Sequence, residues 1–197
     1  VQVVSGITPV LEKMGDQIDF HLEYIGKEPE SGKFTSMHGE PEVQGNIIQL
    51  CAMKHYPKKY LDLLKCINKD FRKIPGNLEE CAKETGFDAA KIKTCTEGEE
   101  GKALLSASYK RAEEKGAKGS PTIFIAGEPY RKGRKEADFM REICSHYKKS
   151  KPAACSDIPE PKIIKVTMIS DKRCDACNPD RLSQNLKGVF PGLETEV

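Results

Sequence analysis

Eight cysteines constrain the fold of this chain more than any other feature. The chain has 197 residues, and its cysteines are Cys51, Cys66, Cys81, Cys95, Cys144, Cys155, Cys174 and Cys177. An even number of cysteines in amphipathic helical segments favours disulfides formed in an oxidising compartment. The alternative is a set of reduced cysteines that pack as small apolar side chains. The spacings suit bridges between helices, so disulfides are the preferred interpretation.

Charge and hydropathy exclude two classes of partner. The net charge is only +2, from 32 basic and 30 acidic residues, so no domain-wide basic excess is available to bind nucleic acid. No apolar run reaches the roughly 18–20 residues that a membrane helix needs. No signal peptide is visible, although a mature chain would lack one.

The first part of the chain predicts a strand, a helix and a second strand. Val1–Val4 has the apolar pattern of a strand end, and Ile7–Met14 that of a short helix after a Ser5 cap. Ile18–Ile25 alternates apolar and polar residues, as a half-buried strand does. Parallel strands in this order would form a right-handed crossover.

A helical block follows a polar loop at residues 26–45. We expect helices at Asn46–Tyr56, Lys59–Phe71, Leu78–Thr85, from an Asp88 cap through Cys95, and at Glu97–Lys115. If neighbouring helices pack as antiparallel pairs, Cys51 can bridge to Cys66, and Cys81 to Cys95. These two disulfides are therefore predicted.

The stretch from Lys118 to Glu128 predicts a buried strand with a proline at its first position. Residues 122–126 are apolar and β-prone, and Pro121 precedes them. The Gly-Ser-Pro-Thr step resembles the cis-proline loop of the thioredoxin fold. The alternative is a trans-proline at an ordinary strand entry. The resemblance implies that Ser120, Pro121 and Thr122 bind the substrate backbone.

Residues 36–51 resemble the signature of the gamma-interferon-inducible lysosomal thiol reductase (GILT) family, Cys-Gln-His-Gly-x-x-Glu-Cys-x-x-Asn-x-x-x-x-Cys. The positions that match are His38, Gly39, Glu42, Asn46 and Cys51. Ser36, Met37 and Val43 depart from it, so two signature cysteines are absent together. His38 is most simply a loop histidine with a local hydrogen bond, and catalysis is the alternative.

The same resemblance covers about residues 18–155 and extends to DsbA-like proteins. A helical block between two strand units is their arrangement, followed here by a hairpin partner at Tyr130–Arg131 and a closing helix at Glu136–Tyr147. The resemblance further implies a disulfide between Cys144 and Cys155. A thioredoxin fold normally has a redox loop and a longer helix after its first strand. Val4 instead runs almost directly into Ser5, so either this domain has lost its redox loop or residues are omitted at that junction.

The end of the chain predicts a second unit that carries a redox pair. Ile163–Ile169 is expected to be a strand, Asn178–Val189 a helix, and Leu193–Val197 a strand, with Cys174 and Cys177 between the first strand and the helix. This order resembles the beginning of a thioredoxin-like domain. A helix start and the adjacent Lys172 and Arg173 would favour the Cys174 thiolate, while Asp175 opposes it.

We therefore predict Cys174 as nucleophile and Cys177 as resolving thiol. An inert disulfide is the alternative for this pair. A zinc knuckle is disfavoured, because no second Cys-x-x-Cys exists and neither His55 nor His146 is near the pair in sequence. No metal site is predicted.

These observations predict an α/β protein with a thioredoxin-like fold, a helical insertion and a partial second thioredoxin-like β-α-β unit. The expected organisation is a GILT/DsbA-like domain at 1–155, a linker at 156–162 and a second unit at 163–197. The expected function is extracytoplasmic thiol–disulfide exchange, in a bacterial periplasm or a secreted or lumenal space, without an organic cofactor. Protein thiols and disulfides would be its substrates, with a redox partner protein as a further possibility. The alternative is a redox-inactive binding or scaffold domain that captures a peptide strand at Pro121, with structural disulfides only.

Overall fold

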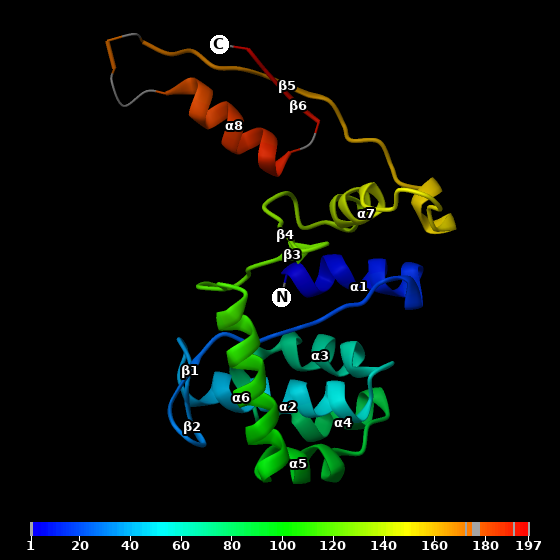
Figure 1. Ribbon diagram of the computed structural model, residues 1–197, viewed down its shortest axis with the longest axis vertical. Helices are drawn as coiled ribbons and strands as arrows, with labels where there is room; N and C mark the ends of the chain where they lie inside the picture. The colour runs from blue at the N-terminus through cyan, green and yellow to red at the C-terminus, as the bar shows by residue number, and fades with distance from the viewer. Residues whose placement is uncertain (1, 172, 175–177, 191, 197) are drawn as a thin grey trace. The chain divides into compact units, whose positions relative to one another are not determined.

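The computed structural model describes residues 2–171, 173–174, 178–190 and 192–196 (Figure 1). The chain folds as two compact units. One is the helical unit, His21–Pro121, and the other combines Val1–Phe20 with Thr122–Val197. In the described residues the strands form three separate two-stranded sheets.

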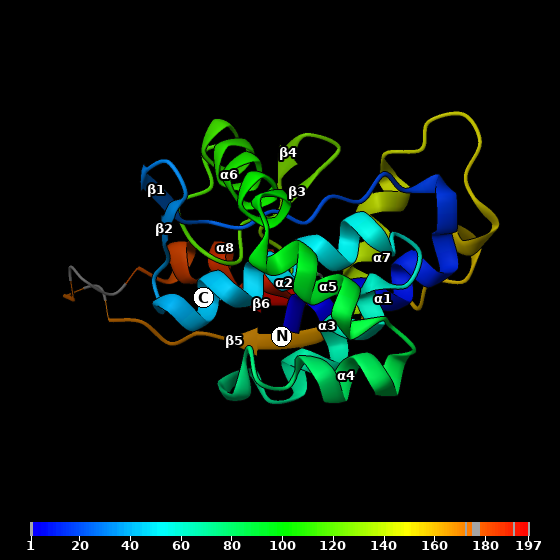
Figure 2. The same cartoon turned by 90° about the horizontal axis from the view of Figure 1, so that it is seen from below.

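The helical unit is built around α2 (Glu40–His55), which is buried over most of its length from Val43 to Ala52. Three helices pack on it: α3 (Tyr60–Lys69), α5 (Ala89–Glu97) and α6 (Glu99–Glu114) (Figures 1 and 2). The short α4 (Leu78–Thr85) packs on α3 and α5, and a 3-10 turn, η2 (Phe71–Lys73), leads towards it. The central helix therefore has little solvent-facing surface in its middle turns, which suits its run of apolar residues.

Local signals place the helix ends of this unit close to where the sequence predicts them. α4 has the predicted bounds, and Gly86 ends it in the left-handed conformation with φ +73°. The Asp88 side chain accepts a hydrogen bond from the backbone N–H of Lys91 at 3.0 Å and so caps α5. α2 begins six residues earlier than expected, at Glu40. The polar loop before it contains an antiparallel hairpin of β1 (Lys27–Glu30) and β2 (Lys33–Thr35).

Two predicted strands are wrong. The strand expected at Val1–Val4 is wrong from Gln2 onward, because α1 begins there and continues to Met14, followed by the 3-10 turn η1 (Gly15–Gln17). Residues 18–25 belong to no sheet. Their backbone is held by side chains instead: the N–H of Tyr24 donates to the hydroxyl of Ser108 on α6 at 2.9 Å. Gly26 lies against the Tyr109 ring, where an added Cβ would come within 2.2 Å of ring carbon.

The other unit contains a small apolar core between α1 and α7 (Glu136–Ser145). Its buried residues are Ile7, Val10, Met14, Tyr130, Phe139, Met140 and Cys144. The rings of Tyr130 and Phe139 stack with centroids 5.3 Å apart. Gly6 permits close packing, since a Cβ there would lie 2.0 Å from the carbonyl oxygen of Arg134. The 3-10 turn η3 (Ala153–Ser156) follows α7.

The same unit contains the hairpin after Pro121 and the C-terminal β-α-β segment. β3 (Phe124–Ile125) pairs antiparallel with β4 (Glu128–Pro129) through the turn residues Ala126 and Gly127, both at positive φ. The hairpin partner therefore starts two residues before the predicted Tyr130. β5 (Ile164–Thr167) and β6 (Leu193–Glu196) are parallel, with α8 (Pro179–Val189) between them in sequence. The predicted strand, helix and strand are thus confirmed for the described residues.

The disulfides of the helical unit differ from the predicted pairs. Cys51 is bonded to Cys95 and Cys66 to Cys81, so the pairs Cys51–Cys66 and Cys81–Cys95 are wrong. The prediction failed because it joined α2 to α3 and α4 to α5. In the structure Cys51 faces α5, and α3 pairs with α4. Four cysteines allow three connectivities, and sequence spacing does not choose among them. Cys144 is bonded to Cys155, the pair that the resemblance implied.

Among the helices that the structure describes, none combines the length and the apolar character needed to cross a bilayer. The predicted boundaries at residues 155 and 163 remain a prediction. The division of the chain into two units follows the helical insertion and joins the first twenty residues to those from Thr122 onward.

Candidate functional site

Cys174 lies on the connection between β5 and α8 in the C-terminal β-α-β segment. The four residue pairs of the parallel ladder run from Ile164–Leu193 to Thr167–Glu196. The helix is capped by Asn178, whose side-chain oxygen accepts from the N–H of Arg181 at 2.8 Å. Ser183 on α8 and Thr195 on β6 share a hydrogen bond of 2.5 Å between their hydroxyls. Hydrogen bonds of the backbone and of side chains therefore hold β5, α8 and β6 together on either side of the connection that carries Cys174.

The local state of Cys174 is that of an oxidised cysteine. Its sulfur is disulfide-bonded, its side chain is half-buried, and its N–H donates to the carbonyl of Asp171 at 2.9 Å. Cys177, the predicted resolving thiol, lies outside the described residues. The expectation that Cys174 stands at the helix start is wrong, because the cap is Asn178, four residues later. The helix dipole acts mainly within the first turn, so its effect on Cys174 is smaller than the sequence suggested.

The charges beside Cys174 also differ from the expectation. Arg173 donates from Nε and Nη2 to the carboxylate of Asp171, and the Arg173 backbone N–H adds a further bond at 2.9 Å. The hydrogen bonds from the Arg173 side chain are the main reason that the pKa of Asp171 lies below its usual value. The same hydrogen bonds raise the pKa of Arg173. Arg173 is thus paired with a carboxylate, which reduces its ability to stabilise a thiolate at Cys174.

The predicted substrate loop is exposed and contains a cis peptide bond between Ser120 and Pro121. Ser120, Pro121 and Thr122 are all solvent-exposed. The carbonyl of Ile123, the next residue, already accepts from the N–H of Tyr130 at 2.8 Å, as part of the hairpin that continues into β3 and β4. The cis form agrees with the predicted loop type and not with the trans alternative. Whether these residues bind a substrate remains a prediction.

The histidine of the signature region has a local partner. His38 Nδ1 lies 3.1 Å from Oε1 of Glu42, and the His38 backbone N–H donates to Oε2 at 3.0 Å. Burial by itself would raise the pKa of Glu42, but hydrogen bonds from Ser36 and His38 outweigh it and lower that pKa. The His38 side chain is 76% exposed, and it makes the local contact that the simpler interpretation expected.

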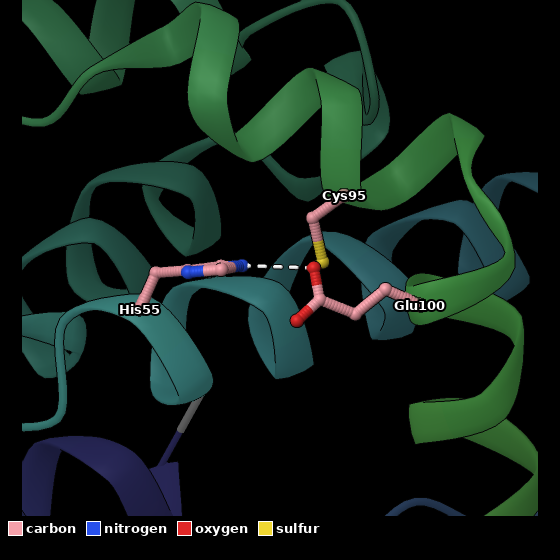
Figure 3. A group of neighbouring side chains, drawn as sticks. All are labelled: His55, Cys95 and Glu100. Carbon is pink, nitrogen blue, oxygen red and sulfur yellow. Dashed lines mark hydrogen bonds and ion pairs between the residues drawn. The ribbon is translucent and has the colours of Figure 1, made fainter.

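Sequence reasoning missed a group of side chains in the helical unit. His55, Cys95 and Glu100 place one nitrogen, one sulfur and one oxygen within 4.8 Å of one another. Figure 3 shows the His55 ring directed at the Glu100 carboxylate, with the Cys95 sulfur beside it. The sequence signal that could have found this group is Cys51-x-x-x-His55, because this spacing places two potential ligands on one helix face.

Comparisons with known proteins give two matching families. The sequence model described as Gamma interferon inducible lysosomal thiol reductase (GILT) matches residues 2–85. The model described as DSBA-like thioredoxin domain matches residues 48–144. The chain is similar to both families. This confirms the resemblance predicted from residues 36–51 and from the helical block.

Two curated relatives support the same similarity. A gamma-interferon-inducible lysosomal thiol reductase of Carassius auratus is 27% identical over 166 residues, which cover 78% of this chain and 65% of the relative. GILT-like protein 1 of Drosophila melanogaster is 28% identical over 143 residues, which cover 62% of this chain and 57% of the relative. The chain thus spans about 65% and 57% of the length of these GILT relatives.

The fold class is α/β and thioredoxin-like with a helical insertion, as predicted. The DsbA-like match covers the helical block from within α2 to the end of α7. Both GILT signature cysteines that are missing fall within the GILT match, at Ser36 and Val43. Val43 is buried on α2 and fills its position with an apolar side chain. The redox chemistry of a dithiol is therefore not available at these two positions.

Proposed function

We propose that this protein is a thiol–disulfide oxidoreductase that acts on protein disulfides through Cys174 and Cys177. The observation that carries the proposal is the context of Cys174: a half-buried, disulfide-bonded cysteine on the strand-to-helix connection of a parallel β-α-β segment. The similarity to GILT and DsbA-like families supports the same chemistry. The two relatives named above include one called a thiol reductase.

The proposed reaction is a reversible exchange of two electrons between a dithiol and a disulfide. The Cys174 thiolate attacks one sulfur of the substrate disulfide, which forms a mixed disulfide and releases the other substrate sulfur as a thiolate. Cys177 then loses its proton and attacks Cys174 Sγ. The intramolecular disulfide forms and the second substrate thiol leaves. A dithiol of a redox partner protein would restore the reduced pair.

Ser120, Pro121 and Thr122 are proposed to hold the substrate chain. They are exposed, and the peptide groups next to them are already ordered by the β3–β4 hairpin. An extended peptide can pair with such a backbone edge, although Pro121 has no backbone N–H to donate to it. This role rests on the resemblance to the cis-proline loop and on the exposure of the three residues.

The three disulfides between described cysteines support an oxidising location. Their cysteines are buried except Cys155, and they join α2 to α5, α3 to α4, and α7 to η3. Such structural bridges persist in secreted, lumenal or periplasmic spaces. We therefore propose an extracytoplasmic protein, and we keep the boundaries 1–155, 156–162 and 163–197 as the proposed organisation.

A redox-inactive binding domain is the second candidate, and one observation favours it. Ser36 and Val43 stand where the signature has cysteines, so the region that most resembles a thiol reductase has no dithiol of its own. On this view the exposed loop at Pro121 would capture a peptide strand without chemistry.

Reduction of insulin disulfides by dithiothreitol, followed as turbidity, distinguishes the two candidates. We expect the intact chain to accelerate the reaction and Cys174→Ser to reduce the acceleration to the uncatalysed rate. The double variant Cys144→Ser/Cys155→Ser removes another bridge of the same unit and should keep the activity. We also expect Cys177→Ser to accumulate a mixed disulfide with a thiol-reactive peptide. An intact chain that is as inactive as Cys174→Ser, with Cys174 unreactive to thiol labels after reduction, would establish the binding candidate.

A further inference from the structure

We propose that reduction of the Cys51–Cys95 disulfide opens a zinc site in the helical unit. Its ligands would be the two thiolates of Cys51 and Cys95, Nε2 of His55 and the carboxylate of Glu100. In the oxidised protein only the histidine and the carboxylate can bind an ion. The proposal goes beyond the proposed function, because it concerns other cysteines in the other unit.

Three of the four groups lie close together, and the fourth, Cys51, is bonded to one of them. Cys51 and His55 are four residues apart on α2 and so lie on the same face, one turn from each other. Cys95 comes from the last turn of α5 and Glu100 from the first turn of α6. The disulfide places the Cys51 sulfur in contact with that of Cys95. The nitrogen, sulfur and oxygen atoms of His55, Cys95 and Glu100 all lie within 4.8 Å of one another (Figure 3).

The packing of α6 holds Glu100 at this position. A Cβ on Gly101 would lie 2.5 Å from the Cys95 carbonyl oxygen and 2.7 Å from Cγ2 of Ile47. Glycine therefore permits the first turn of α6 to touch the end of α5. Glu100 is in the first turn of α6, so the positive end of that helix dipole favours its carboxylate at this position.

The distance between the nitrogen and oxygen ligands suits a tetrahedral ion. Zinc with bonds of about 2.1 Å to nitrogen and oxygen would separate these two ligands by roughly 3.4 Å. His55 Nε2 and Glu100 Oε2 are 3.0 Å apart, so a small opening of the pair is sufficient. The His55 side chain is 21% exposed and that of Glu100 is 44% exposed, which gives an ion a path from solvent.

The donor set selects zinc over the common hard cations. Two thiolates and an imidazole are soft and borderline ligands, which suit Zn²⁺, whereas Mg²⁺ and Ca²⁺ prefer oxygen alone. A set of two cysteines, one histidine and one carboxylate fills the four positions of a closed structural zinc site.

Formation of the site requires a dithiol or phosphine reductant. A dithiol supplies two electrons and two protons, becomes a disulfide itself, and leaves thiols on Cys51 and Cys95. A phosphine does the same with water, which supplies the two protons, and becomes a phosphine oxide. Zinc binding then releases the two thiol protons, because thiolates are the ligands. Exchange with a small-molecule disulfide, which takes up the two electrons and leaves as two thiolates, would re-form the Cys51–Cys95 bond and expel the ion.

Cobalt spectroscopy on the full chain tests the proposal. The chain would carry Cys174→Ser and Cys177→Ser, so that this dithiol binds no metal and the result does not depend on the proposed function. After phosphine reduction, mass spectrometry of alkylated protein confirms that Cys51 and Cys95 are thiols. We expect added Co²⁺ to give thiolate charge-transfer bands and tetrahedral ligand-field bands at one equivalent per chain, and Zn²⁺ to displace it. The oxidised protein should give neither set of bands.

Single variants separate this site from the other cysteine pairs. His55→Ala and Glu100→Gln should each weaken Zn²⁺ binding at least ~10-fold. Loss of a residue that only hydrogen-bonds to a metal ligand already costs about this much, so loss of a ligand should cost no less. His38→Ala is the matched control, because His38 also pairs with a glutamate at 3.1 Å, and among the described residues this pair belongs to no group of three potential ligands. It should leave binding unchanged.

Three outcomes would overturn the proposal if the reduced chain stays folded. They are the absence of tetrahedral cobalt bands in the reduced chain, bands that survive both His55→Ala and Glu100→Gln, and failure of the Cys51–Cys95 pair to reduce while the chain stays folded. If reduction unfolds the helical unit, far-ultraviolet circular dichroism becomes the readout. Zn²⁺ should then restore the helical signal, and His55→Ala should prevent the recovery. No recovery with the intact ligand set would also overturn the proposal.

Discussion

The helical unit and the C-terminal β-α-β segment use their cysteines in opposite surroundings. In the helical unit all four cysteines are buried and fasten helices that already share an apolar core. In the β-α-β segment Cys174 is half-buried, and its apolar neighbours along the chain are open to solvent: Ile163, Ile164, Ile169, Leu182 and Phe190. Reactive groups belong in regions with few buried contacts, and structural bridges belong in dense ones. We propose on this basis that the first region serves stability and the second serves accessible chemistry.

The largest expected change in the free energy of unfolding comes from removing the Cys51–Cys95 bridge, and it tests this comparison. It closes a loop of 44 residues, for which the chain-entropy estimate gives roughly 4 kcal/mol. We expect Cys51→Ala/Cys95→Ala to lower the free energy of unfolding by about that amount in a guanidinium titration. The control Cys144→Ala/Cys155→Ala opens a loop of 11 residues and should cost about 3 kcal/mol. The reverse order would show that strain or residual structure, not loop length, sets these energies.

The next largest loss of stability is expected when a core side chain is truncated. Leu105 on α6 is fully buried, so Leu105→Ala should cost about 3 kcal/mol through lost contacts and a residual cavity. Ile169, after β5, is 98% exposed, and Ile169→Ala should change the free energy of unfolding by less than about 0.5 kcal/mol. Thermal or denaturant unfolding of the two variants measures the contrast. Equal losses would contradict the division into a stabilising and an accessible region.

A smaller effect is expected at the hydrogen bonds that hold the extended segment after Phe20. Ser108 is fully buried, accepts from the N–H of Tyr24 and donates to Oε2 of Glu23 at 2.6 Å. Ser108→Ala leaves both partners without this bond and should cost roughly 1–2 kcal/mol. Thr94→Ala, an exposed hydroxyl on α5, is the control and should be nearly neutral. Hydrogen exchange at the Tyr24 amide should accelerate in the first variant only, and an unchanged rate would show that this bond does not hold the segment.

These hydrogen bonds also explain what sequence could and could not predict. The bounds of α4 and the cap at Asp88 follow from residues within a few positions of each helix end, and both were predicted. The strand at 18–25 was predicted from the correct alternation but is wrong, because its partner is a helix side chain 84 residues away. The alternation predicted a half-buried strand, but the distant helix decided which groups the segment pairs with.

The same limit applies to the candidate sites. The order of strand, Cys174, helix and strand was predicted, since its spacing is local. The partners of Cys51 and Cys66 were not, because the choice depends on which helix faces which. The group of His55, Cys95 and Glu100 was missed for the same reason, since α2 and α6 bring together residues 45 positions apart. The pairing of Asp171 with Arg173 is local, but the sequence analysis treated the charge of Arg173 as acting on Cys174 and did not consider Asp171 as its partner.

The smallest expected effect concerns this last pair. Asp171→Asn frees the positive charge of Arg173 beside Cys174 and should lower the pKa of the reduced Cys174 thiol. Because Arg173 lowers the pKa of Asp171, the carboxylate stays ionised at every pH above its usual value, and the pair is lost only as the pH falls through the lowered pKa. The difference between variant and parent should therefore be full near pH 7. We expect alkylation of reduced Cys174 by iodoacetamide at that pH to be about 2- to 5-fold faster in Asp171→Asn, a modest change because the pair is solvent-exposed.

Two further variants decide whether this charge pair sets the reactivity of Cys174. Arg173→Gln leaves the Asp171 carboxylate unpaired and should slow the alkylation, since a nearby negative charge opposes thiolate formation. Glu194→Gln, which removes the partner of Lys165 at 3.9 Å in the β5–β6 ladder, should leave the rate unchanged. If all three variants react at the parent rate from pH 6 to 9, the partial solvent access of Cys174, and not the charges around it, sets its reactivity. The contrast with the buried bridges of the helical unit would then rest on burial alone.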